Sequence, residues 1–288
     1  MTVLFKQITI CGVGLIGGSL ALVARQSGLA GKIVGLGRSV ENLELARVRG
    51  IIDVGTRDPI AAARDANLVM LATPIRAMPA TLRAMRPALP PDAIVTDVGS
   101  VKHWVIEQLE PELGPQMALV AAHPIAGKET TGAGAADAAL FRGHRVIITP
   151  SARSTPAAVE QIETLWKATG ARVSRMAPAI HDRLLARASH LPQIVASTLA
   201  AALDDDARID GVRAADYGAG GLHDTTRIAA SSPEIWIDIC LTNRAAIIEA
   251  LAGFRGILEE FAGCLEKRDE AGLKKIFERG RTMRKGLA

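Results

Sequence analysis

Aromatic side chains are scarce in this sequence, because Phe, Tyr and Trp together make up 3% of its 288 residues. Proteins that bind single-stranded nucleic acid stack the bases on such rings, so a binding platform of that kind is not expected. The net charge at pH 7 is +4, and Lys and Arg are spread along the chain without a basic block. This mild excess gives little support for nucleic-acid binding and suits anionic small molecules instead.

Cysteine is also rare: Cys11, Cys240 and Cys264 lie far apart, form no C-x-x-C pair and stand among apolar residues. Free, buried thiols in a reducing compartment are the simplest interpretation. The N-terminus lacks the charged and then apolar segments of a secretion signal, and no apolar run reaches membrane-spanning length. We therefore expect a cytoplasmic protein without membrane contact. No His, Cys or acidic cluster has metal-ligand spacing, so no metal site is predicted.

Strand-like and helix-like segments alternate over roughly the first 150 residues, which predicts an α/β domain with a doubly wound parallel sheet of the Rossmann type. The predicted strands span 3–11, 32–37, a short stretch near Ile52, 68–73, 93–100, 118–122, 145–150 and 171–176. The predicted helices between them span 20–26, 39–49, a segment ending near Arg86, 102–109 and 155–170.

The second half has a different character, with helical patterning at 178–203, 233–266 and 269–286 and no alternating strand pattern. We place a dinucleotide-binding domain at 1–176 and an all-helical substrate and dimerisation domain at 177–288. Segments such as 194–203 and 245–254 are apolar around much of the helix circumference, so they need packing partners. Packing within one chain could supply them, but a homodimer formed through the helical domain is the favoured interpretation.

A glycine-rich turn, G-x-G-x-x-G, joins the first predicted strand to the first helix. Gly12 permits a tight turn, Gly14 lets the backbone approach a pyrophosphate, and Gly17 lets the helix pack closely on the sheet. The phosphates of a dinucleotide would then meet the free N–H groups at the helix N-terminus, around Leu15 and Ile16. In this strand-to-helix context the motif predicts a nicotinamide dinucleotide site.

The tip of the second predicted strand indicates which dinucleotide is bound. NAD sites usually carry an Asp or Glu there for the ribose 2′-hydroxyl, but this tip reads Gly37–Arg38–Ser39, with no carboxylate before Glu41. Arg38 would pair with a 2′-phosphate and Ser39 would hydrogen-bond to it, so we predict NADP as the preferred cofactor and NAD as the second. A solvated Arg38 without this role is the alternative. The predicted cofactor set is completed by the residues at the end of the 68–73 strand, Thr73 and Pro74.

Polar residues also gather at predicted strand ends and on the helical half. His123 stands in V-A-A-H-P-I-A-G-K-E at 120–129, directly after an apolar strand, where open α/β sheets place their ligands. Ser100 follows the preceding strand, and a helix N-cap is its structural alternative. His181 and His190 lie along one predicted helix, and they are interpreted first as structural residues that bridge the helix to the sheet.

Five motifs follow one another along the chain: the glycine-rich turn, D-V-G-S-V-K at 97–102, H-P-I-A-G-K-E at 123–129, S-H-L-P at 189–192 and T-R-I-A-x-S-x-P-x-I-W at 226–236. In this order they resemble the TyrA-type prephenate/arogenate (cyclohexadienyl) dehydrogenases, and the resemblance covers nearly the whole chain. It implies an oxidative decarboxylation in tyrosine biosynthesis. The C4 hydroxyl of a cyclohexadienyl ring is deprotonated, hydride leaves C4 for the nicotinamide, and the ring carboxylate departs as CO₂.

The resemblance also implies roles for single residues. His123 would be the base for the C4 hydroxyl, since a neutral imidazole removes protons near pH 7. Ser100 would bind the same hydroxyl or orient the imidazole, and Arg227 would bind a substrate carboxylate through its planar fork, with a surface ion pair as its alternative. Glu129 resembles a gating residue, and Trp236 resembles one that reaches a neighbouring subunit's site. The remaining predicted substrate residues are Lys128, His190 and Gln193.

The chain departs from some family members in two respects. Gln193 stands where some prephenate-specific enzymes have a second His, which leaves the choice between prephenate and arogenate open. The sequence ends soon after the helical domain, so no fused chorismate mutase and no added regulatory domain are expected.

The sequence is also compatible with two other functions. One is another reductase with a Rossmann domain and a helical dimer, of the β-hydroxyacid dehydrogenase or pyrroline-carboxylate reductase kind. The former are organised around a catalytic Lys where this chain reads H-D-R at 181–183. The other is a dinucleotide sensor without turnover. Ser100, His123 and Arg227 together argue against a sensor, which has no need of a base.

Overall fold

The computed structural model describes residues 3–203 and 208–287, and its first half forms an eight-stranded sheet in the order β3-β2-β1-β4-β5-β6-β7-β8. The strands are β1 (Phe5–Cys11), β2 (Ala30–Leu36), β3 (Val54–Thr56), β4 (Leu68–Leu71), β5 (Ile94–Asp97), β6 (Ala118–Pro124), β7 (Arg145–Pro150) and β8 (Arg172–Arg175). From β3 to β6 all neighbours are parallel. This is the Rossmann order, which places the ligand crevice where the strand order reverses, at the carboxyl ends of β1 and β4.

Strand β7 departs from the predicted parallel arrangement, because it runs antiparallel to β6 and pairs His123 with Ile147. A parallel return would need a crossover segment, usually a helix, that passes over the sheet. The connection 125–144 has only the three-residue turn η4 (Ala133–Ala135) within it, so the chain comes back along the same edge. Strand β8 is parallel to β7 because α6 (Pro156–Ala168) supplies that crossover.

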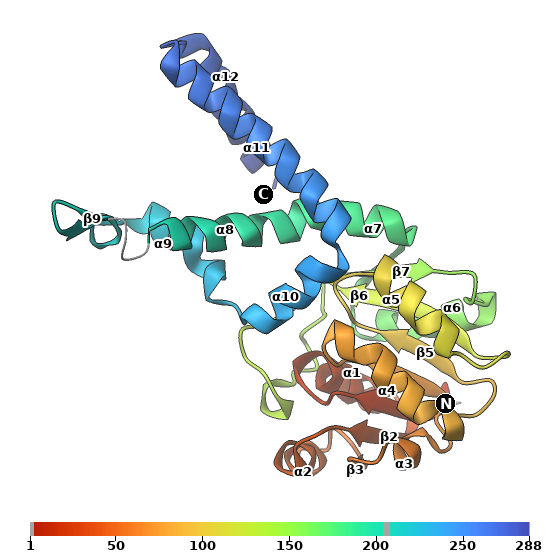
Figure 1. Ribbon diagram of the computed structural model, residues 1–288. Helices are drawn as coiled ribbons and strands as arrows, with labels where there is room; N and C mark the ends of the chain where they lie inside the picture. The colour runs from red at the N-terminus through yellow and green to blue at the C-terminus, as the bar shows by residue number, and fades with distance from the viewer. Residues whose placement is uncertain (1–2, 204–207, 288) are drawn as a thin grey trace.

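Helices cover both faces of the sheet (Figure 1). On one face pack α1 (Leu15–Gln26), α2 (Val40–Val48) and α6, and on the other pack α3 (Pro59–Ala63), α4 (Met78–Met85) and α5 (His103–Leu109). Strand β4 shows why its sequence is apolar throughout. Leu68 and Met70 point into the first core and Val69 and Leu71 into the second, as expected for a strand buried on both sides.

The second half is helical. It contains α7 (Pro178–Leu185), the π-helical turn η5 (Ala186–His190), α8 (Leu191–Ala202), η6 (Ala214–Tyr217), α9 (Gly220–Thr226), η7 (Arg227–Ala230), α10 (Pro233–Thr242), α11 (Arg244–Glu266) and α12 (Glu270–Lys285). Ala186, Ile239 and Ile247 join the second core of the sheet domain. Helices α11 and α12 extend away from the rest of the chain (Figure 1).

A small hairpin interrupts the helices, which the sequence pattern did not predict. It consists of β9 (Arg208–Ile209) and β10 (Val212–Arg213), too short to show an alternating pattern. The turn between them is Asp210–Gly211, and both residues have positive φ, at 51° and 84°. An Asp-Gly pair in this conformation is a strong local signal for a two-residue hairpin turn.

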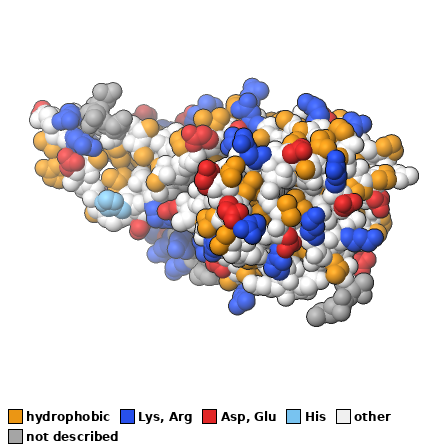
Figure 2. Space-filling model, turned by 90° about the horizontal axis from the view of Figure 1, so that it is seen from below, with side chains coloured by type: hydrophobic (Ala, Val, Ile, Leu, Met, Phe, Trp, Pro, Cys, Tyr) orange, Lys and Arg blue, Asp and Glu red, His pale blue; other side chains and the backbone are white. Residues whose placement is uncertain are grey.

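The surface differs between the two halves. Over the strand-containing half, Lys and Arg side chains are interspersed with Asp and Glu (Figure 2). The helical half exposes many large apolar side chains, among them Ile235, Ile248, Leu258 and Phe277. None of the helices in 3–203 and 208–287 has the length and apolarity needed to cross a bilayer.

The three cysteines are free, as predicted. Cys11 is buried, whereas Cys240 and Cys264 are half-buried rather than enclosed.

Candidate active site

The glycine-rich turn has the conformation that its sequence predicts. Gly12 has φ +94°, and a Cβ there would lie 2.5 Å from the carbonyl oxygen of Ala72. A Cβ on Gly17 would lie 2.5 Å from the carbonyl oxygen of Gly12. Gly14 is different, since a Cβ there would meet nothing within 4 Å. Two glycines are therefore required by the fold, and the third leaves open space at the start of α1, where Leu15 and Ile16 form the first turn.

Further features of a dinucleotide site lie at the neighbouring strand tips. The hydroxyl of Thr73, just past β4, is buried and has no hydrogen-bond partner among the described residues. Pro74 follows it and precedes the turn η1 (Ile75–Ala77). An unpaired buried hydroxyl beside an open helix N-terminus fits a polar ligand that would supply the missing hydrogen bond.

The tip of β2 carries charges of both signs. Arg38 is exposed, and Gly37 before it packs against Leu43. Ser39 caps α2 by accepting from the Asn42 N–H, and its hydroxyl donates to the Glu41 carboxylate at 2.7 Å. That bond lowers the pKa of Glu41, with a smaller contribution from the charge of Arg57.

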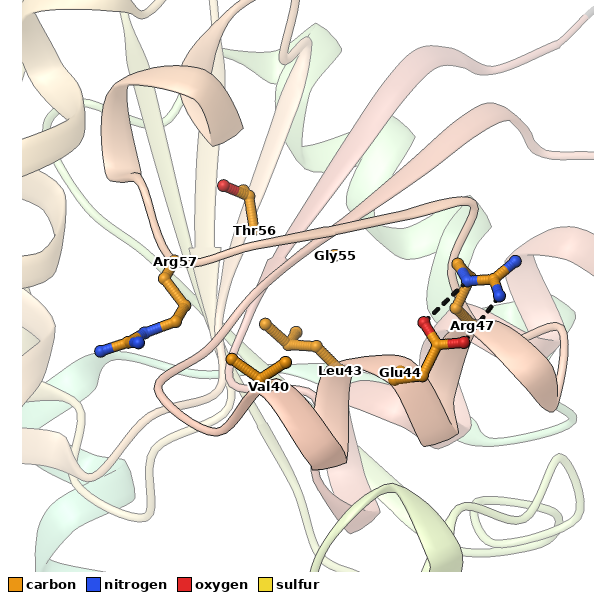
Figure 3. A pocket seen from close by; sticks show the side chains of 7 residues that line it. All are labelled: Val40, Leu43, Glu44, Arg47, Gly55, Thr56 and Arg57. Atoms are coloured by element: carbon orange, nitrogen blue, oxygen red, sulfur yellow. Dashed lines mark hydrogen bonds and ion pairs between the residues drawn. The ribbon is translucent and has the colours of Figure 1, made fainter.

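Arg57 also borders a pocket between α2 and β3, and its side chain points away from Thr56 and Gly55 (Figure 3). The pocket's other lining residues are Val40, Leu43, and Glu44 and Arg47, which bond to each other. Arg57 follows the poorly patterned strand β3, so no local sequence signal marks it.

The connection 125–144 links the dinucleotide turn to His123. The Asn42 side chain donates to the carbonyl of Val13 and accepts from the N–H of Ala133, both at 2.8 Å. The Ser19 hydroxyl of α1 accepts from the N–H of Asp137 at 2.9 Å. The segment that follows His123 is thus fixed to both helices that flank the glycine-rich turn.

His123 lies at the end of β6, is 8% exposed, and is part of a chain of side chains that continues into α7. Its Nδ1 lies 2.9 Å from Nε2 of His181, and Nδ1 of His181 lies 2.8 Å from Oδ1 of Asp182. Burial, and next the nearby His181 and Lys102, hold the pKa of His123 well below its ordinary value of 6.5. Its imidazole is therefore neutral near pH 7, the state that can accept a proton.

A fully buried ion pair supports the backbone beside His123. Lys102 and Asp97 have no exposed side-chain surface, and the ammonium of Lys102 contacts the Asp97 carboxylate. The same ammonium donates to the carbonyl of Ala122 at 2.8 Å, and Asp97 accepts from the N–H of Ala122. Burial lowers the pKa of Lys102, although the attraction of Asp97 opposes this. The pair fixes the peptide groups of the residue that precedes His123.

His190 is almost completely enclosed, at 1% exposed. Its Nδ1 lies 3.2 Å from the Asn243 amide nitrogen, which can donate to it, and its Nε2 is buried without a partner among the described atoms. The Trp236 ring lies edge-on to His190 within the same chain, with centroids 6.2 Å apart. Burial lowers the pKa of His190 to about 4.

The structure brings some of the predicted substrate residues together. Arg227 and Glu129 form an ion pair at 3.5 Å, although their side chains are 67% and 81% exposed. Gln193 is buried and donates to the carbonyl of Ile228 at 2.9 Å, so its amide holds the turn that carries Arg227. Lys128 instead pairs with Asp137 at 2.8 Å.

Ser100 is not the N-cap of α5, the alternative considered for it. It lies three residues past β5, and Lys102 occupies the N-cap position without a side-chain bond. At the N-terminus of α5, the backbone N–H groups of Lys102 and His103 donate hydrogen bonds to the Asp182 carboxylate at 2.8 and 2.9 Å. No local sequence signal marks this function of Asp182, because Lys102 and His103 lie 80 and 79 positions away from it in the chain.

Comparisons with known proteins agree with this architecture. The family model described as prephenate dehydrogenase, nucleotide-binding domain, matches residues 20–175, and that of the prephenate dehydrogenase dimerization domain matches residues 177–279. The chain is 36% identical to the cyclohexadienyl dehydrogenase of Zymomonas mobilis, over 100% of this chain and 97% of that protein.

Two solved structures are similar over the whole chain. Prephenate dehydrogenase from Aquifex aeolicus, in complex with hydroxyphenyl propionate and NAD+, has a TM-score of 0.94 at 32% identity and covers 100% of both chains. The arogenate dehydrogenase of Synechocystis has a TM-score of 0.84 at 27% identity, over 98% of this chain and 100% of that one. By its sequence over both domains, this chain belongs to the prephenate dehydrogenase family.

Proposed function

We propose that this chain is an NAD(P)-dependent dehydrogenase of tyrosine biosynthesis that oxidatively decarboxylates prephenate, arogenate or both. The observation that carries the proposal is the position of His123, a neutral imidazole at the end of β6. The connection that follows it is bonded to α1 and α2 beside the glycine-rich turn. Family membership supports the reaction, and the position of His123 near the glycine-rich turn supports its assignment as the base.

His123 acts as the base in this proposal. Its Nε2 takes the proton of the C4 hydroxyl, and a nicotinamide dinucleotide held at the glycine-rich turn would supply the acceptor for the hydride that leaves C4. The bond between the ring and its carboxylate breaks and releases CO₂. The electron pair of that bond stays in the ring and completes its aromatic system. Ser100, past the end of the neighbouring strand β5, hydrogen-bonds the same hydroxyl or orients the imidazole.

Arg227 binds a carboxylate of the substrate, and its present partner Glu129 marks where that carboxylate would compete. An arginine fork binds a carboxylate through two parallel hydrogen bonds, which a single carboxylate contact at 3.5 Å does not achieve. Gln193 holds the Arg227 turn in place, and the buried Nε2 of His190 has no partner among the described atoms and is free for the substrate. Lys128 and Trp236 complete the substrate set of the proposal.

We propose NADP as the preferred cofactor, with Arg38 as the partner of its 2′-phosphate. Arg57 adds a second positive charge close to the β2 tip. Glu41 is the competing feature, because a carboxylate bonded to Ser39 there would bind ribose hydroxyls and repel a phosphate. The ratio of kcat/KM for NADP and NAD decides between the two, and a clear advantage for NAD refutes this part of the proposal.

We also propose a homodimer formed through the helical domain. The apolar side chains that α10, α11 and α12 expose need a partner surface, and Ile235, Leu258 and Phe277 are each more than half exposed in the single chain. In this proposal the helical domain, from residue 177 onward, both binds the substrate and forms the interface between the two subunits.

The test is turnover followed at 340 nm with prephenate and with arogenate, each with NADP and NAD. His123→Asn should lower kcat by about 10²–10⁴, the usual range for losing a general base, with little change in cofactor binding. His144→Asn is the matched control, because His144 is exposed at the start of β7 and belongs to no proposed site. Near-full turnover in His123→Asn contradicts the assigned role, and absence of turnover with both acids in the unmodified chain contradicts the proposed function.

A further inference from the structure

Two residues outside the proposed substrate and cofactor sets, His181 and Asp182, are connected to His123 by hydrogen bonds. Asp182 is 5% exposed and His181 is fully buried, and both belong to α7, the helix that follows the sheet domain. They reach His123 through two hydrogen bonds of 2.8 and 2.9 Å, across 58 residues of sequence. Neither residue has a role in the proposed chemistry, so their arrangement needs its own explanation.

The Asp182 carboxylate is in the ionised state. Its burial opposes ionisation, but hydrogen bonds from His181 and from the N–H groups of Lys102 and His103 outweigh burial and lower the pKa of the carboxyl group. The backbone N–H groups of Lys102 and His103 can only donate to it, and an ionised carboxylate has only acceptors to offer to His181. The Nδ1 of His181 must therefore carry a hydrogen and donate it to Asp182.

The order of donors and acceptors then follows along the chain. Burial lowers the pKa of His181, so this ring is neutral near pH 7 and carries a single hydrogen. With that hydrogen on Nδ1, its Nε2 is an acceptor. The contact at 2.9 Å then requires His123 to donate from its own Nδ1. His123 is also neutral, so its Nε2 is left without a hydrogen.

We infer that Asp182 and His181 are positioning residues that hold His123 in the tautomer with hydrogen on Nδ1 and a free electron pair on Nε2. The inference rests on the proposed function, which requires His123 to accept a proton. A carboxylate serves the same purpose for the catalytic histidine of serine proteases, where the wrong tautomer is strongly deleterious. Here a second imidazole is inserted, because the carboxylate is needed at the N-terminus of α5.

The double use of Asp182 decides which residue to change. A substitution at Asp182 also removes the acceptor for two backbone N–H groups of α5, so its effects would be mixed. His181→Phe keeps a planar ring and leaves Asp182 in place, but it has no hydrogen bond to offer. His181→Gln is the conservative partner, since its amide nitrogen can donate to Asp182 while its oxygen accepts from His123.

The experiment is ¹⁵N NMR of histidine-labelled full-length protein, combined with kinetics. The chain has 6 His residues, and the His123 signals are assigned by their loss in His123→Asn. In the unmodified protein we expect His123 with hydrogen on Nδ1 and none on Nε2, and the same in His181→Gln. In His181→Phe we expect His123 to populate both tautomers, while cofactor binding stays unchanged. The kcat should fall by about 10- to 100-fold, as for the loss of a hydrogen bond within a charged network. Glu112→Gln, which removes a carboxylate from the remote ion pair with Arg83, should change neither readout.

The outcomes separate the inference from the function. Hydrogen on Nε2 of His123 in the unmodified protein overturns the inference, whether or not any variant folds. An unchanged His123 tautomer in His181→Phe also overturns it. An equal loss of kcat in both His181 variants, with the His123 tautomer unaltered, overturns it too, because that result would indicate a packing role for His181. The NMR needs no substrate, so a chain that turns over neither acid but shows the expected tautomers refutes the proposed function and leaves the inference standing.

Discussion

Acidification should destabilise this protein through His190, and the size of the effect follows from its environment. The unfolded chain takes up a proton on this imidazole near its ordinary pKa of 6.5, whereas in the folded chain burial lowers the pKa to about 4. Between these values the unfolded state binds more protons, so the free energy of unfolding falls as pH falls. The difference between the two pKa values corresponds to about 3 kcal/mol in the free energy of unfolding. This contribution is present in full above pH 6.5 and is lost by about pH 4.

The assay is urea unfolding at pH 7, 5.5 and 4.5, at one fixed protein concentration because the proposed dimerisation would add to the apparent stability. His190→Asn is the matched variant, since its side-chain oxygen can still accept from Asn243 and has no proton to gain. The unmodified protein should lose about 2–3 kcal/mol more than His190→Asn over this range, with other buried imidazoles affecting both equally. Equal pH dependence in the unmodified protein and His190→Asn would refute the reasoning.

Two further predictions concern the dinucleotide turn and the substrate carboxylate. Gly14→Ala should keep the free energy of unfolding within about 1 kcal/mol, as for a helix cap change, because a Cβ there meets nothing within 4 Å. It should raise the Kd for NADP and NAD at least about tenfold in fluorescence titration. Gly17→Ala would place its Cβ 2.5 Å from the Gly12 carbonyl oxygen, so it should lower the free energy of unfolding by about 1–3 kcal/mol in urea unfolding. Similar behaviour of the two variants would contradict this prediction. Arg227→Ala should raise the substrate KM about tenfold or more with a smaller change in kcat, and Arg227→Lys should not restore it, since Lys lacks the bidentate fork. An unchanged KM in steady-state kinetics would remove Arg227 from the substrate site.

Local sequence signals were sufficient where structure depends on neighbouring residues. The alternation of apolar strands with amphipathic helices predicted the parallel sheet from β3 to β6, and the G-x-G-x-x-G spacing predicted the turn whose Gly12 has positive φ. The position of His123 at the end of a strand followed from the His-Pro step after an apolar run. The Asp210–Gly211 hairpin carried a signal of the same local kind, which was overlooked because each strand has two residues.

Features that depend on the path of the chain could not be predicted in this way. The direction of β7 follows from the absence of a crossover helix in 125–144, a property of the whole connection rather than of the strand. Ser100 could be read as a helix cap from its neighbours, but the cap of α5 comes from Asp182 on a different helix. His181 and His190 are both predicted to bridge the helix to the sheet. His181 does so through His123, whereas the ring of His190 contacts Asn243 and Trp236 of the helical half, and neither set of partners has a local sequence signal.

The environment of His123 combines a low pKa with a fixed orientation, and the proposed reaction explains why both are tolerated. A base of lowered pKa is weaker, which would be a disadvantage against an ordinary alcohol. As hydride leaves C4, however, positive charge develops on the carbon that carries the hydroxyl, and the O–H becomes strongly acidic. The base then needs only to be neutral and aimed at that hydrogen. Burial keeps His123 and His181 neutral, and the ionised Asp182 determines, through His181, which nitrogen of His123 carries the free electron pair. In such a site the direction of the electron pair matters more than basicity, so loss of the His181 link should affect kcat more than it affects either binding step.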